Sequence, residues 1–264
     1  MGKHRAAFSL VELSIVLVIL GLLVGGILAG RSLIRASELR QVSAEVTKTR
    51  TSWYAFRDKY FALPGDMPNA IAFWGAADTS GTNGECANIL TSVGTGTQTC
   101  NGSGDSMVNG NEKYRFWQHL ANAGLVPGEY TGIAGPDPSG SGLNDVPGSN
   151  IPRVPSSTES AGMAVSWITK TSIDASFGFS APAGHYLSMG RCCHPSNKTL
   201  AGPIFTAEDT WNMDTKIDDG MPYFGRLQIQ KGYFSGCSVT QTEAAEYDLD
   251  ATTVACKPLF RITP

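Results

Sequence analysis

Charged side chains and recognisable catalytic motifs are both scarce in this chain. Asp, Glu, Lys and Arg make up 16% of 264 residues, and histidine occurs four times with no obvious nucleophile partner. The sequence has no Gly-x-Ser-x-Gly, metalloprotease or phosphate-binding motif. It also lacks the basic footprint typical of nucleic-acid binding. These absences argue against an enzyme. They also give no support to a role that requires nucleic-acid binding, such as DNA uptake.

The feature that is present is one long apolar run. It extends over residues 8–30, follows a short basic leader at residues 1–7, and contains Glu12 as its only charge. About 20 apolar residues suffice to span a bilayer, whereas the apolar region of a secretory signal peptide has about 7–15. The run therefore predicts an anchor helix. A carboxylate at the centre of such a helix costs about 2.5–3.5 kcal/mol, so we expect Glu12 to have a partner.

The string Ala7-Phe8-Ser9-Leu10-Val11-Glu12-Leu13 resembles the processing and methylation motif of type IV prepilins and of type II secretion pseudopilins. The firm resemblance covers roughly the first 60 residues. It implies that a prepilin peptidase/methyltransferase removes residues 1–7 by cutting between Ala7 and Phe8, and that Phe8 is then N-methylated. The family usually has Gly before the cut, and Ala7 is a departure that keeps a small residue there.

The same resemblance gives Glu12 an assembly role. Cleavage creates a charged amine at Phe8, and in a filament Glu12 of one subunit can meet that amine on a neighbour. Opposite charges attract strongly where the dielectric constant is low, and an unpaired charge there is expensive. The implied partners are pilin-like subunits in a homo- or hetero-polymer, membrane lipid and an inner-membrane assembly platform.

After the apolar run, the spacing of apolar residues predicts that the helix continues as an amphipathic helix over residues 31–61. Apolar or small side chains recur at alternating spacings of three and four, which places them on one stripe. The stripe comprises Leu39, Val42, Val46, Thr49, Trp53, Phe56 and Tyr60. The segment Leu63-Pro64-Gly65-Asp66 should end the helix near Phe61. Residues 8–61 would then form a helix about 80 Å long.

The remaining residues, 62–264, are expected to form a globular head outside the cytoplasm, in the periplasm and then on a cell-surface or periplasmic filament. Their 11 basic and 19 acidic residues give a net charge of −8, whereas residues 31–61 carry +4. Solubility of a secreted surface is the favoured explanation of the acidic head, and docking between subunits is the alternative.

The head contains six cysteines, and disulfides are the default in an oxidising compartment. Local pairing of Cys86 with Cys100 and of Cys237 with Cys256 is the economical choice among fifteen connectivities. The adjacent Cys192 and Cys193 can form a vicinal disulfide, or each can pair elsewhere. The nearby histidines suggest a metal, but their spacing matches no standard zinc pattern.

The fold class expected for the whole chain is α+β: a long N-terminal helix packed on an antiparallel sheet with long loops at 75–111 and 127–160. A short helix is predicted over 112–123, with Phe116, Trp117 and Leu120 inward and His119 at the surface or in a cap. A capping box at Thr206 predicts a second helix, to about Ile217. Strands are expected at Ala164–Ile168, His185–Met189, Phe224–Gln230 and Leu259–Thr263.

Three acidic residues lie close together where that second helix ends and a turn begins: Asp214, Asp218 and Asp219. Clustered carboxylates suit calcium, and some pseudopilins bind calcium in their heads. The stretch lacks the spacing of a calcium loop, so a solvated turn is the favoured interpretation and no cofactor is expected.

The resulting functional hypothesis is a structural subunit of a type IV pilus-like filament. The alternative is a minor pilin or a type II secretion pseudopilin whose head binds a surface or a secreted substrate. The two long loops are the natural contact regions in that case.

Overall fold

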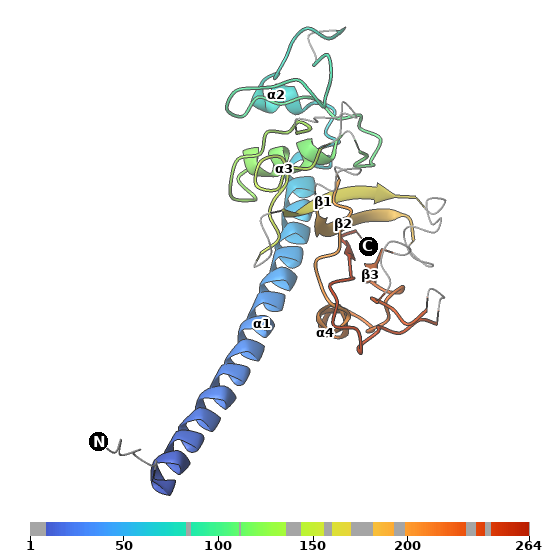
Figure 1. Cartoon of the computed structure of the whole chain (residues 1–264). Helices are drawn as coiled ribbons and strands as arrows, with labels where there is room; N and C mark the ends of the chain where they lie inside the picture. Colours follow the sequence, from blue (N-terminus) through green and yellow to red (C-terminus); the bar gives the residue numbers. More distant parts are fainter. Residues whose placement is uncertain are drawn as a thin grey trace, which may run out of the picture.

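The computed structural model of the chain describes residues 9–82, 86–110, 112–135, 144–155, 160–169, 182–192, 199–230, 236–240 and 244–263. One helix, α1 (Leu10–Tyr60), packs against a head through its C-terminal part, and its N-terminal part projects away from the head (Figure 1). The head combines shorter helices with an antiparallel sheet. The architecture is the α+β, pilin-like arrangement expected from the sequence.

The C-terminal part of α1 is amphipathic, as its stripe predicts. Its buried residues are Leu39, Val42, Thr49, Ser52, Trp53 and Phe56. The Trp53 ring lies 5.6 Å from that of Phe116 and 4.5 Å from that of His185, measured between centroids. The helix ends where Phe61 adopts the left-handed conformation, with φ at 54°, and its N–H donates to the Arg57 carbonyl. The part of α1 from residue 31 to residue 60 is here called the stalk, and one stripe of it therefore supplies the central wall of the head's core.

The sheet consists of β1 (Ala161–Ile168), β2 (Gly184–Arg191), β3 (Leu227–Ile229) and β4 (Pro258–Arg261), in the order β1-β2-β4-β3. All three pairings are antiparallel, with Val165 opposite Leu187 and Leu187 opposite Phe260. These three side chains are buried in the main core. The C-terminal strand therefore lies inside the sheet, which local sequence patterns had left undetermined.

Among the described residues, the head also contains three short helices: α2 (Ala70–Trp74), α3 (Lys113–Asn122) and α4 (Ala207–Ile217). The predictions of α3 and α4 are confirmed, including the capping box between Thr206 and Asp209. The expectation that His119 lies at the surface or in a cap is wrong. Its side chain is fully buried because Phe56 of α1, Trp74 of α2 and the loop residue Thr99 pack against the ring.

The disulfides Cys86–Cys100 and Cys237–Cys256 hold loops of the head. They are the two pairs expected from the sequence. Cys192 is buried and disulfide-bonded, and Cys193 lies outside the described residues. Residues 76 and 99 form an isolated bridge beside the first disulfide, so this loop is anchored without belonging to the sheet.

Candidate functional site

The first turn of α1 holds the charge that the sequence singles out. Glu12 is the third helical residue, and its Oε2 accepts a hydrogen bond from the Ser9 backbone N at 2.9 Å. The Ser9 hydroxyl in turn accepts from the Val11 N at 3.2 Å. Glu12 thus has a partner in its own chain as well as the partner expected on a neighbour. Ala7 and Phe8 lie outside the described residues.

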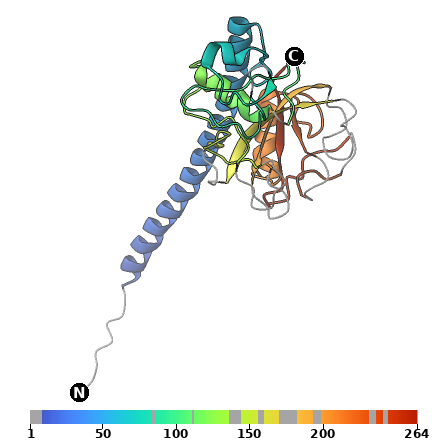
Figure 2. The ribbon, with the colours of Figure 1, turned by 90° about the horizontal axis from the view of Figure 1, so that it is seen from above.

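The helix beyond this turn exposes an unusually large apolar surface. Leu10 is 83% exposed and Leu22 is 73% exposed, and the window of α1 that is long and apolar enough to cross a membrane is not buried at all in the head. Figure 2 shows the same segment extending clear of the head. A contiguous apolar surface of this size needs a cover of lipid or protein.

A protein-family model described as the prokaryotic N-terminal methylation motif matches residues 2–28. This chain carries the type IV prepilin signature. Comparison with curated proteins and with solved structures gives no match. The prepilin signature is typical of structural subunits rather than of enzymes, and with the apolar helix it indicates membrane anchoring.

The head of this prepilin-like chain contains a group of three carboxylates at the end of α4, from Asp214, Asp218 and Asp219. Asp214 is fully buried: its Oδ2 accepts from the Tyr247 hydroxyl at 2.9 Å, and its Oδ1 has no hydrogen-bond partner among the described residues. Burial, with the charges of the two neighbouring aspartates, raises the pKa of Asp214 to about 7. The structure therefore brings together the three candidates that the sequence named.

A second carboxylate group, which the sequence analysis did not single out, comprises Asp66, Asp105 and Glu112. Its two buried members are used by the local loop. Asp66 accepts hydrogen bonds from the backbone N of residues 104–106, and Glu112 accepts from the backbone N of Ser103 and Asn109. These carboxylates replace regular secondary structure as acceptors for the loop, and this accounts for their burial.

Buried cations of the head were also missed from the sequence. Lys113 Nζ lies 2.6 Å from Asp145 Oδ1, and both side chains are buried. Lys257 is buried nearby, and burial lowers its pKa to about 8 although Asp145 opposes the shift. A lysine at the start of an amphipathic helix is normally expected to be exposed to solvent. Only the fold therefore reveals the buried pair of Lys113 and Asp145.

Proposed function

We propose that this chain is a structural subunit of a type IV pilus-like filament. In this proposal it is inserted in the bacterial inner membrane, a prepilin peptidase cuts it before Phe8, and it polymerises through its N-terminal helix with the head outside the cytoplasm. The observation that supports the proposal best is the exposed apolar half of α1, which projects away from a folded head. Lipid covers that surface before assembly and fellow subunits cover it afterwards.

Glu12 gives the proposal a specific test, because its bond to Ser9 N and its proposed pairing with Phe8 of a neighbour can be removed separately. Within the chain it accepts a hydrogen bond from Ser9 N, which a glutamine side chain can also do. Pairing with the amine of Phe8 on a neighbour requires a negative charge. Glu12→Gln therefore keeps the capping hydrogen bond and removes the charge, whereas Ser9→Ala removes the reciprocal cap and keeps the charge.

We expect Glu12→Gln to reach the membrane, to be processed and to be lost from sheared filaments. Ser9→Ala should still assemble. Normal filaments from Glu12→Gln would contradict the charge-pairing role. N-terminal mass spectrometry of the wild-type protein from cells tests processing directly, since N-methyl-Phe8 is expected and an intact Met1 would overturn the proposal.

The alternative is a minor pilin or a type II secretion pseudopilin whose head contacts a surface or a secreted substrate. The observation in its favour is the irregular chain of the head, for example residues 75–82 and 86–110, which belong to none of the helices or sheet strands. Copy number separates the two roles. An abundant protein throughout sheared filaments indicates a major subunit, and trace amounts at filament tips indicate a minor one.

A further inference from the structure

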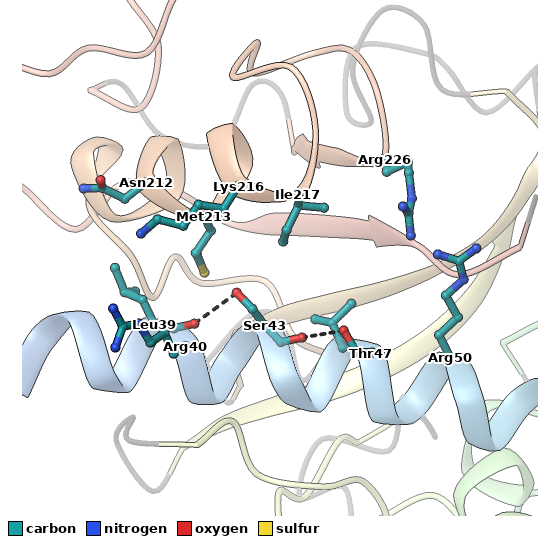
Figure 3. A pocket seen from close by; sticks show the side chains of 11 residues that line it. Leu39, Arg40, Ser43, Thr47, Arg50, Asn212, Met213, Lys216, Ile217 and Arg226 are labelled. Atoms are coloured by element: carbon teal, nitrogen blue, oxygen red, sulfur yellow. Dashed lines mark hydrogen bonds between the residues drawn. The ribbon is translucent and has the colours of Figure 1, made fainter.

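A groove of about 330 Å³ lies between the stalk and the head, where α4 crosses α1. Its floor is apolar and includes Leu39 and Val46 of α1 together with Met213 and Ile217 of α4. Figure 3 shows Leu39, Met213 and Ile217 between the two helices. The groove lies beyond the apolar run of α1, and it adjoins the acidic cluster at the end of α4, where the Arg226 backbone N donates to Asp218 Oδ2.

Four cationic side chains surround this floor: Arg40 and Arg50 from the stalk, Lys216 from α4 and Arg226 from the segment before β3. None forms an ion pair with a carboxylate in the part of the chain that the structure describes. The Arg50 and Arg226 side chains extend toward each other across the groove (Figure 3). Like charges converging on one groove repel, and an anion placed between them relieves the repulsion.

The position of the groove favours protein carboxylates over lipid phosphates as its ligand. A helix rises 1.5 Å per residue, so Arg40 and Arg50 lie roughly 15 and 30 Å beyond Gly30, where the apolar run ends. The headgroup region on each side of a bilayer is only about 5–8 Å thick. The cations therefore stand above the membrane surface, at the level of neighbouring heads.

The chain itself supplies a complementary surface in residues 244–250, here called the acidic loop. Glu246 and Asp250 are exposed, Asp248 is half-buried, and Leu249 between them is 50% exposed. The disulfide Cys237–Cys256 brackets the loop, and Tyr247 fixes it to Asp214. The loop thus presents three carboxylates and one apolar side chain on an anchored backbone, which matches four cations around an apolar floor.

We propose that the groove of one subunit binds the acidic loop of a second copy of this chain. The inference rests on the proposed filament function and names the head-to-head contact within it. Groove and loop are different surfaces: Met213 lines the groove, whereas Asp214, which holds the loop, projects about 100° further around α4. A contact between two different surfaces is heterologous, and repeated along one direction it builds an open helical polymer.

Reciprocal charge reversal in the full-length chain tests this contact. The groove variant carries Lys216→Glu and Arg226→Glu, and the loop variant carries Asp248→Lys and Asp250→Lys. Each variant alone places like charges against each other in a homopolymer, so we expect at least a tenfold loss of sheared filament. Co-expression of the two variants restores both interfaces in an alternating polymer, and filament should return with both copies present in similar amounts.

Matched controls are Lys59→Glu and Glu129→Lys, which reverse exposed charges outside the groove and the loop. Both should assemble at the wild-type level. Each variant must reach the membrane and be processed at Phe8, so that a loss of filament reports assembly rather than folding. A carbodiimide cross-link joining Lys216 of one copy to the acidic loop of an epitope-tagged copy would give direct support.

Assembly of the groove variant at the wild-type level would overturn the inference and leave the filament function intact. Loss of filament with no recovery on co-expression would also overturn it. So would a groove variant that binds anionic vesicles more weakly than the wild type does, because the groove would then be a site for lipid phosphates. Absence of both N-methyl-Phe8 and filaments in the wild type would instead contradict the proposed function itself.

Discussion

Arg35 of the stalk and Asp209 of α4 are joined by two parallel hydrogen bonds, from Nε to Oδ1 at 2.9 Å and from Nη2 to Oδ2 at 2.5 Å. Asp209 also belongs to the capping box of α4, where its Oδ2 accepts from Thr206 N. Burial alone would raise the pKa of Asp209, and the hydrogen bonds from Arg35 and Thr206 lower it below its ordinary value. One carboxylate therefore fixes α4 to the stalk and begins the helix.

Asp209→Asn keeps an acceptor for the cap and removes the charge that faces Arg35. Because Arg35 is 42% exposed at its side chain, we expect a modest loss of about 1 kcal/mol in the free energy of unfolding. A carboxyl whose pKa is lowered by folding stabilises the protein above its unfolded pKa, and that stabilisation is lost as the pH falls through the folded pKa. Denaturant titrations at pH 7 and pH 3 should therefore show the variant's deficit shrinking with acidity.

The ends of the helices could be predicted from the sequence because local chemistry decides them. The breaker after Phe61 and the capping box at Thr206 involve side chains within a few residues of the backbone groups they satisfy. Glu12, and the group of Asp214, Asp218 and Asp219, could likewise be singled out from neighbouring residues in the sequence. These features required no knowledge of the head's three-dimensional arrangement.

The burial of α3 could not be predicted in the same way. Arg115 and His119 lie on its polar face, which normally indicates solvent, yet both are fully buried. Groups distant in sequence satisfy them: Arg115 Nη2 donates to the carbonyls of Ile89 and Ser92, and His119 Nδ1 accepts from the Gly65 N. The sheet order is equally long-range, because β4 pairs with β2 across more than 65 residues. The cationic groove combines residues from α1, α4 and the segment before β3, so spacing alone does not reveal it.

Trp53 is the stalk residue whose loss should most weaken the packing of the head. It is 1% exposed and contacts aromatic rings of both α3 and β2. Truncation of a buried aromatic side chain typically costs about 3–5 kcal/mol, so Trp53→Ala should lower the free energy of unfolding by that amount. Thr51→Ala, on the exposed side of the same turn, is the matched control and should change it by less than about 0.5 kcal/mol. Equal losses in the two variants would contradict this packing role.

His119 should make the head sensitive to acid. Burial, with the nearby charge of Arg115, lowers its pKa to about 3. The neutral ring accepts a hydrogen bond from Gly65 N at Nδ1, and its Nε2 lies 2.9 Å from Thr99 Oγ1. A histidine whose pKa is lowered by folding contributes stability above its unfolded pKa near 6.5, and this contribution declines as the pH falls toward 3.

The measurement is the melting temperature between pH 7 and pH 3.5 for the wild type and His119→Gln. The variant should be less stable at pH 7 and should have a shallower acid slope. His185, whose pKa burial lowers to about 4, contributes a second slope of the same sign. His119→Gln/His185→Gln should therefore be flatter than either single variant. An unchanged acid slope in the double variant would assign acid sensitivity to other groups.

Asp214 should act in the opposite direction. Folding raises its pKa from about 3.8 to about 7, so the folded state holds its proton more tightly than the unfolded state does. Its contribution to stability is greatest below the unfolded pKa and is lost as the pH rises through about 7. Asp214→Asn resembles the protonated acid, so it should be more stable than the wild type at pH 8 and nearly equal at pH 4. Asp219→Asn, which changes an exposed member of the group, should have the smaller effect.

Calcium binding remains a proposal for the same three carboxylates. It can be tested at pH 8, where the Asp214 carboxyl group, with its pKa of about 7, is largely ionised. The orphaned Oδ1 of Asp214 and the carboxylates of Asp218 and Asp219 are oxygen ligands of the kind calcium prefers. A cation held there would neutralise the buried charge, so millimolar calcium should raise the melting temperature of the wild type at pH 8 and chelator should lower it. Asp214→Asn should not respond to either. A wild-type melting temperature unaffected by calcium and by chelator would assign the group to a solvated turn that binds no calcium.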